Sequence, residues 1–132
     1  MNDCIFCKIV KGEIPSKTIY ENEEIKVMMD INPETNGHLL LIPKKHYENI
    51  FDMDEKLIMD MIKIIKTKLY PLVSEKLGCE GMTICQNNLL GQDVKHFHIH
   101  LIPRYPEDKM TFFTNKEIIK ELEEVYAKLT EK

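Results

Sequence analysis

The sequence predicts an α+β fold: a five-stranded, mostly antiparallel sheet, one long helix between the third and fourth strands, and a closing C-terminal helix. Three observations support this prediction. Five short segments have the composition of strands, a long segment with helical apolar spacing separates the third from the fourth, and no linker or repeat interrupts the chain. At 132 residues we expect a single domain spanning residues 1–132, large enough to bury a core.

The first elements are a short helix and a hairpin. Apolar residues in the segment 5–10 have the spacing of one helical face, and Gly12 ends that helix. Residues 18–20 and 25–29 predict two strands that turn around Asn22.

A buried strand and a long helix follow. The continuous apolar run 38–43 predicts a central strand covered on both faces. Asp52 followed by Glu55 predicts a helix start with a capping box, and Gly78 predicts its end, with a kink or interruption at Pro71. The apolar stripe of this amphipathic helix consists of Leu57, Ile58, Met61, Ile62, Ile65, Leu69, Leu72, Val73 and Leu77.

The last elements are two strands and a helix. Residues 82–87 predict the fourth strand, and the segment from Val94 to Arg104 predicts the fifth, ending at Pro103. Thr114 and Glu117 predict a second capping box. A closing amphipathic helix is predicted from Ile118, Leu122, Val125, Tyr126 and Leu129, whose apolar side chains we expect in the core.

The fifth strand carries the clearest functional signal. Successive side chains of a strand point to opposite faces, so alternating residues share a face. One face would present His96, His98 and His100, and the other would bury Phe97, Ile99 and Leu101. Histidine is no strong strand former, so three in register are not a propensity effect. Their spacing suits a row of groups along a phosphate chain or around a metal, and a neutral imidazole can act as nucleophile, base or ligand.

The polar loop 87–93, which precedes this strand, supplies what an anion site needs. Gly91 permits close backbone approach, and the N–H groups after it could face an oxyanion.

The pair Cys4-x-x-Cys7 is half of a tetrahedral zinc site. Candidates for the other half are Cys79, Cys85, His46 and His96. The alternative is that Cys4 and Cys7 are small buried hydrophobic residues.

Charge and hydropathy exclude several classes of function. A net charge of -4 argues against a nucleic-acid polymer as partner, whereas a single mononucleotide can be held by backbone N–H groups and imidazoles. No apolar stretch has the length of a signal peptide or a membrane span. We therefore expect a cytoplasmic protein without a membrane partner.

These segments resemble the histidine triad (HIT) family. The segment 91–102 is similar to the motif His-φ-His-φ-His-φ-φ, in which φ is apolar, and segments 5–9, 13–15, 29–33 and 37–46 resemble the family's opening, ribose-contacting turn and central strand. The closest resemblance is to the bacterial, zinc-containing form of the Hint-like nucleoside phosphoramidases. The resemblance therefore implies the HIT fold.

The resemblance also implies a reaction. The chain would cleave purine nucleoside phosphoramidates or related mononucleotide conjugates, with AMP as product, through a nucleotidyl-histidine on His98. His100 and the backbone of Gly91, Gln92 and Asp93 would stabilise the phosphoryl oxygens, and His38 would support the triad. Asp30 would accept the ribose hydroxyls and Asn87 would border the ribose and phosphate. The base pocket would be lined by Ile5, Phe6, Ile9, Met28 and Ile31.

The resemblance further implies structural zinc on Cys4, Cys7, His46 and His96, no organic cofactor, and a homodimer. Three features depart from the family: the loop before the triad is about two residues shorter than loop lengths lead us to expect, it carries Leu89-Leu90 where small or polar residues are usual, and the chain has no Trp. The alternatives are a nucleotide-binding adaptor or sensor without catalysis, a dinucleoside polyphosphate hydrolase, and a metalloenzyme with His96, His98 and His100 on one metal.

Overall fold

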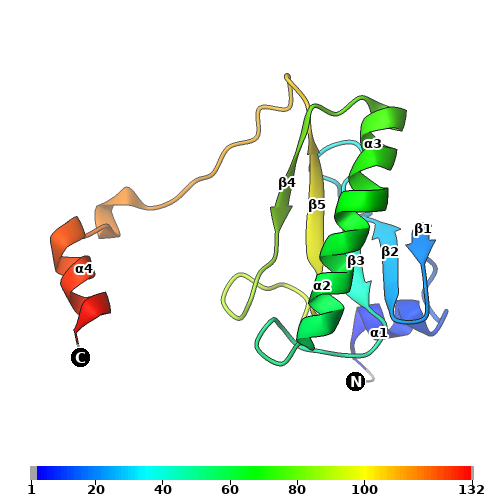
Figure 1. The fold of residues 1–132 in the computed structure, drawn as a ribbon, viewed down its shortest axis with the longest axis horizontal. Coiled ribbons are helices and arrows are strands. Elements are labelled where there is room, and N and C mark those ends of the chain that lie inside the picture. The colour runs from blue at the N-terminus through cyan, green and yellow to red at the C-terminus, as the bar shows by residue number, and fades with distance from the viewer. Residues whose placement is uncertain (1–2, 132) are drawn as a thin grey trace.

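The structure, a computed structural model, describes residues 3–131. Five antiparallel strands form one sheet in the order β1-β2-β3-β5-β4, which confirms the predicted α+β arrangement (Figure 1). The strands are β1 (Thr18–Glu21), β2 (Ile25–Met29), β3 (Leu39–Pro43), β4 (Gly81–Cys85) and β5 (Ile99–Arg104). The helices are α1 (Ile5–Val10), α2 (Glu55–Ile64), a π-helical turn at Ile65–Leu69, α3 (Tyr70–Leu77), a 3₁₀ turn at Lys116–Ile118 and α4 (Leu122–Thr130).

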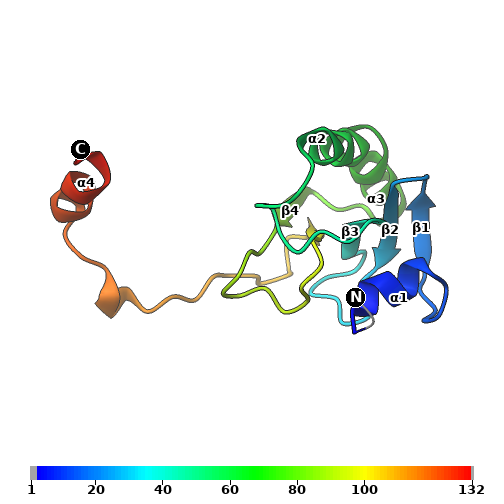
Figure 2. The ribbon, with the colours of Figure 1, turned by 90° about the horizontal axis from the view of Figure 1, so that it is seen from below.

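The two faces of the sheet are covered by different helices. Helices α2 and α3 lie across one face, and α1 lies against the other (Figure 2). The larger core cluster, between the sheet and α2–α3, includes Phe97, Ile99 and Leu101, as the alternation predicted. The smaller cluster, under α1, consists of Phe6, Met28, Leu40 and Ile42. Strand β3 is buried along its whole length, which confirms that it is central.

The long helix is one continuous rod with a π-helical turn before Pro71. Proline has no N–H, so it cannot continue the ordinary helical ladder, and the π turn absorbs this defect without ending the helix. The N-cap predicted for this helix, Asp52, is wrong by two residues, because Asp54 is the N-cap. Asp54 accepts from the N–H of Leu57, while Asp52 accepts from the N–H groups of Glu48 and Asn49 and so closes the preceding loop.

Strand β5 begins later than predicted. Its ladder with β3 starts at Ile99, and the N–H of Phe97 instead donates to the carbonyl of Tyr47. Residues 94–98 thus leave the sheet, which frees the first two histidines to turn toward other parts of the chain. Pro103 lies within β5 and does not end it, because the ladder with β3 already stops at Leu101 and needs no N–H from Pro103.

The C-terminal segment differs most from prediction. Residues 111–131, which we call the arm, extend away from the body and are all exposed (Figure 1). The 3₁₀ turn is capped by Asn115, which accepts from the N–H of Glu117, and α4 begins only at Leu122. The predicted burial of its apolar stripe is therefore wrong for the single chain. Among residues 3–131, no helix has the length and hydropathy needed to cross a membrane.

Candidate active site and metal centre

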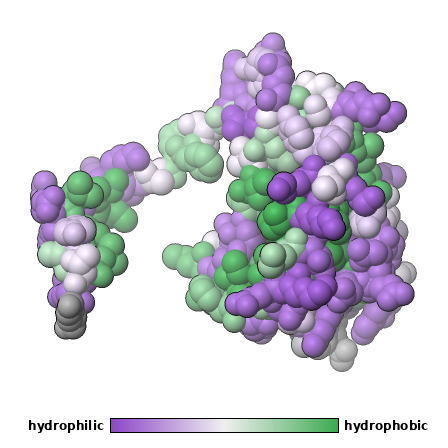
Figure 3. Space-filling view, viewed as in Figure 1, coloured by the Kyte–Doolittle hydropathy of each residue, from purple (hydrophilic) through white to green (hydrophobic). Residues whose placement is uncertain are grey.

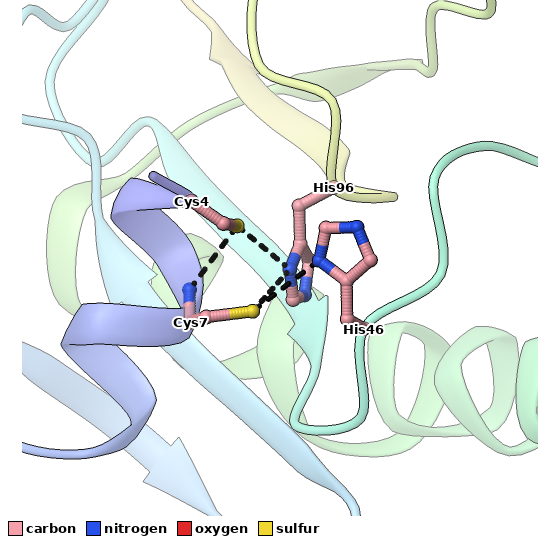
Figure 4. Close-up of side chains that lie close together, drawn as sticks. All are labelled: Cys4, Cys7, His46 and His96. Atoms are coloured by element: carbon pink, nitrogen blue, oxygen red, sulfur yellow. Dashed lines mark hydrogen bonds between the residues drawn. The ribbon is translucent and has the colours of Figure 1, made fainter. Parts of the chain in front are cut away.

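Two cysteines and two histidines converge where α1 meets the segment before β5 (Figure 4). The ligand atoms of Cys4, Cys7, His46 and His96 all lie within 4.8 Å of one another. The Nδ1 atom of His96 is 3.3 Å from Cys4 Sγ and 3.6 Å from Cys7 Sγ, and His46 Nδ1 is 3.3 Å from Cys7 Sγ. Tetrahedral zinc separates sulfur and nitrogen ligands by about 3.6 Å, so the observed spacings fit that ion.

The ring of His96 is oriented for this role. Its Nε2–H donates to the carbonyl of Pro43 over 2.8 Å, so its Nδ1 carries the free lone pair toward the sulfur atoms. Burial lowers the pKa of His96 to about 4, and burial together with the hydrogen bond to Cys4 raises the pKa of the Cys7 thiol. Cys79 and Cys85 take no part: Cys79 is in the main core, and Cys85 lines a different pocket.

His98 is held with one nitrogen free. Its Nδ1 is 2.8 Å from the carbonyl of His96. A carbonyl can only accept, so Nδ1 carries the proton and Nε2 of the neutral ring carries a lone pair. Nε2 lies 3.6 Å from a carboxylate oxygen of Asp93, and the ring of Phe6 packs edge-on against His98 with centroids 5.1 Å apart. The Nδ1 hydrogen bond thus leaves Nε2 as the ring nitrogen that is available to the pocket described below.

A second chain of hydrogen bonds fixes His100. The N–H of Glu34 donates to Nδ1 of His38, so the proton of neutral His38 is on Nε2. That Nε2 is 2.9 Å from Nδ1 of His100 and 3.5 Å from a carboxylate oxygen of Asp30. When His38 donates to His100, the proton of His100 must be on Nε2, where it can donate to a bound group.

Burial supports these neutral forms. It is the main cause that lowers the pKa of His38, against the opposing pull of Asp30 and Glu34. It is also the main cause that lowers the pKa of His100, to which the neighbouring His98 and His38 add. Both rings are therefore neutral near pH 7.

An apolar pocket of about 220 Å³ opens beside His98 and His100. It brings together every residue predicted for the base pocket, namely Ile5, Phe6, Ile9, Met28 and Ile31, with Asp30 at its rim. Sequence reasoning did not assign Ile14, Pro15, Ser16, Leu40 and Val94, which also line it. Leu40 pairs directly with His100 across β3 and β5, and only the register of the sheet could have revealed it.

A polar pocket shares Asp30, Asp93 and His100 with the apolar one. It is lined by Asp30, Asn32, Glu34, His38, Cys85, Asn87, Gly91, Asp93, His100 and Ile102. Asn87 and Gly91 therefore border this pocket and not the apolar one. The side chain of Gln92 reaches neither pocket: it is buried, accepts from the N–H of Leu89 and donates to the carbonyls of Glu48 and Val94.

The three aligned histidines do not surround one metal. In the part of the chain that the structure describes, His96 belongs to the cysteine cluster, and His100 groups with Asp30 and His38. His98 belongs to neither group. The metalloenzyme alternative, which needs all three imidazoles on one ion, is inconsistent with this geometry.

The sequence profile of the HIT domain matches residues 11–107, which is well over half of the chain. The chain belongs to the HIT family.

Relatives of this HIT protein extend the comparison. It is 47% identical to an uncharacterised HIT-like protein of Methanocaldococcus jannaschii, covering 80% of this chain and 81% of that protein. It is 36% identical to an adenosine 5'-monophosphoramidase of Schizosaccharomyces pombe, covering 80% and 77%. A zinc-bound histidine triad protein of Mycobacterium smegmatis has a similar structure, with 33% identity, a TM-score of 0.78 and coverage of 86% and 84%.

The HIT family match does not reach the arm, since it ends at residue 107. The site lies entirely inside the matched region, apart from α1. Helix α1 and its N-cap contribute Cys4 and Cys7 to the cluster and Phe6 to the apolar pocket, so the cluster and the pocket share one short element.

Proposed function

We propose that this protein is a nucleotidyl hydrolase that cleaves purine nucleoside phosphoramidates or related mononucleotide conjugates and releases AMP. One observation carries the proposal: His98, whose Nδ1 is tied to a backbone carbonyl, lines an apolar pocket suited to a base. His100, Asp30 and Asp93 line that pocket and also a polar pocket suited to a leaving group. The named activity of the Schizosaccharomyces pombe relative supports this choice over a dinucleoside polyphosphate hydrolase.

Substrate would bind across the two pockets. The purine would lie against the apolar side chains from α1 and β2, and Asp30 at the rim would accept hydrogen bonds from the ribose hydroxyls. This places the α-phosphate at His98 and His100, close to the backbone of Gly91, Gln92 and Asp93. The leaving group would then point into the polar pocket, where Asn87 lies.

The reaction would proceed in two displacements. Nε2 of His98 attacks the α-phosphorus, the P–N bond breaks, and the leaving nitrogen takes a proton from solvent and departs as an amine; the water that later hydrolyses the intermediate returns one proton to solvent. Nε2–H of His100 donates to a phosphoryl oxygen as charge develops there. Water then attacks the nucleotidyl-histidine, which releases AMP and restores His98.

Cys4, Cys7, His46 and His96 would hold a structural zinc ion. The observed spacings and the zinc-bound Mycobacterium smegmatis relative support this assignment. Four protein ligands complete a tetrahedron, so the ion would cross-link α1 to the triad segment and take no part in the displacements. The proposal needs no organic cofactor.

We also propose a two-fold homodimer. Strands β1 and β4 are the edges of the sheet, and edge strands with free hydrogen-bonding groups are usually covered. Pairing two copies would cover one edge in each.

Mass spectrometry of the protein incubated with an adenosine phosphoramidate and quenched at alkaline pH tests the proposal. We expect amine release and a nucleotidyl adduct on the peptide that contains His98, with His98→Ala as the control that forms no adduct. Binding of AMP with no amine release would support the adaptor alternative and overturn the enzymatic proposal.

A further inference from the structure

The loop before the triad segment contains a tight turn with an unusual backbone conformation at its first residue. The φ angle of Leu89 is 66°, in the left-handed region that residues with a side chain rarely adopt. The N–H of Gln92 donates to the carbonyl of Leu89 over 3.0 Å and closes the turn, in which Gly91 has a φ of 96°. A left-handed leucine persists only where the contacts around it hold it in place.

Side-chain packing contributes little to holding this turn. Leu89 is 59% exposed and Leu90 is 100% exposed. Figure 3 shows hydrophobic side chains at the lower left of the body, where the loop lies in Figure 1, so the apolar part of the loop faces solvent. Hydrogen bonds must therefore hold the turn.

Two polar side chains supply those hydrogen bonds. Oε1 of Gln92, a buried residue, accepts from the N–H of Leu89 over 3.1 Å. Nζ of Lys95 donates to the carbonyl of Leu89 over 3.3 Å and to the carbonyl of Gln92 over 3.0 Å. One ammonium group thus bridges the first and the last residue of the turn.

The bond from Lys95 also fixes the direction of the peptide group that joins Gln92 to Asp93. The C=O and the N–H of a trans peptide point in opposite directions, so the N–H of Asp93 points away from the ammonium. Among residues 3–131, no group accepts from this N–H. Asp93 lines both pockets, and its carboxylate is 3.6 Å from Nε2 of His98. The residue that carries the free N–H therefore lies beside the candidate nucleophile.

We infer that Lys95 is a positioning residue: it orients the Gln92–Asp93 peptide so that the N–H of Asp93 donates to a phosphoryl oxygen in the transition state. A cation at the carbonyl of a peptide also polarises its N–H, which makes the N–H a stronger donor as negative charge develops on the phosphoryl group. Lys95 acts through the loop backbone and does not touch the substrate. The inference rests on the proposed reaction at His98.

Removing the ammonium group tests this role. Lys95 is exposed, so we expect its variants to fold. Lys95→Met keeps a long side chain that cannot donate, and kcat for an adenosine phosphoramidate should fall about tenfold while KM changes by less than about twofold. Lys95→Arg, which can still donate to two carbonyls, should keep at least about half of kcat. Lys66→Met removes the same charge at an exposed position of the π-helical turn and should leave kcat unchanged.

An NMR measurement tests the orientation of the peptide without turnover. AMP should move the amide proton of Asp93 downfield, because that proton then meets a phosphate oxygen. The movement should be about half as large or smaller in Lys95→Met and retained in Lys95→Arg.

The outcomes separate this inference from the proposed reaction. If Lys95 only stabilises the fold, Lys95→Met will have a lower melting temperature with unchanged kcat and an unchanged Asp93 shift, which would overturn the inference. An Asp93 amide that AMP does not move in the unsubstituted protein would also overturn it. An unsubstituted protein that shows the Lys95-dependent shift but releases no amine would overturn the reaction and leave the orientation of the Asp93 N–H by Lys95 supported.

Discussion

Three imidazoles that look equivalent in the sequence are made different by what each one contacts. His96 gives its Nε2–H to the Pro43 carbonyl, His98 gives its Nδ1–H to the His96 carbonyl, and His100 receives at Nδ1 from His38. In the neutral rings, the remaining nitrogen therefore carries a lone pair in His96 and His98, whereas in His100 it carries the proton and can donate. Contacts with backbone carbonyls and with one neighbouring ring thus distinguish the three rings, in agreement with the proposed roles of ligand, nucleophile and donor.

This division predicts distinct variants. His98→Ala should abolish both turnover of an adenosine phosphoramidate and the nucleotidyl adduct, because the attacking atom is gone, while AMP still binds. His100→Ala should lower the rate by roughly 10²–10³, since one donor to the phosphoryl oxygen is lost, and should still form a slow adduct. Quenched-flow mass spectrometry measures both. An adduct that persists in His98→Ala would show that another residue is the nucleophile.

The lowered pKa values of His38 and His100 predict an acid-sensitive site. A buried histidine whose folded pKa lies below the unfolded value of about 6.5 binds its proton more readily in the unfolded chain. The unfolding free energy should therefore fall as pH drops below about 6.5. Imidazole titration by NMR should give midpoints below that value for both rings.

A His38→Gln variant, compared with the unsubstituted protein, tests this pH dependence of the unfolding free energy. This variant lacks one of the two buried rings, so its unfolding free energy should depend less steeply on pH between neutrality and pH 5. An equal slope in both proteins, or NMR midpoints at or above the unfolded value, would contradict the predicted neutral pair.

Among the elements, α1 depends most on the proposed metal. It is six residues long, and Cys4 is both its N-cap, accepting from the N–H of Cys7, and a candidate ligand. Cys4→Ala should abolish stoichiometric zinc and lower the melting temperature more than it lowers turnover at low temperature. Elemental analysis and calorimetry check this, with Cys85→Ala, outside the cluster, expected to retain zinc. Full zinc content in Cys4→Ala would contradict the assignment.

The start of α2 provides an element-scale prediction free of metal. Asp54→Ala removes the side chain that accepts from the N–H of Leu57 and should cost about 1 kcal/mol of unfolding free energy. Glu75→Ala, an exposed position in α3, should change it by less than about 0.5 kcal/mol. Urea denaturation distinguishes the two, and equal effects would mean that the cap contributes nothing measurable.

Periodicity predicted the elements well and their ends less well. The apolar stripe from Leu57 to Leu77 identified the long helix because the buried side of a helix repeats along the chain. The cap was misplaced because Asp52 and Asp54 are both good acceptors, and only the path of the loop decides which one reaches Leu57. The predicted start of β5 was too early because apolar and polar residues already alternate through His96 and His98, before the ladder begins at Ile99.

For the site, the sequence could identify residue types but not all of their neighbours. The triad and the cysteine pair were recognisable from their spacing along the sequence, and Asp30 was recognisable only from the resemblance to the HIT family. Leu40 was not, because its place beside His100 depends on strand register between distant segments. The arm misled for a related reason: the apolar stripe predicted a buried side of α4, whereas the structure leaves every residue of α4 exposed.

At the scale of the whole molecule, the proposed homodimer predicts a mass. Light scattering at micromolar concentration should give twice the chain mass of 15.6 kDa, since pairing two copies covers one edge strand in each. A single-chain mass at that concentration would contradict the dimer.

The strand order also constrains how the protein is made. β5 follows the other four strands in the chain, yet it is inserted between β3 and β4. During synthesis, β4 has no neighbour in the sheet until β5 leaves the ribosome, and the candidate nucleophile arrives with that same segment. A stalled, shorter chain therefore has neither a closed sheet nor a site. The arm emerges later still, so the sheet can be completed before the arm is available for any contact.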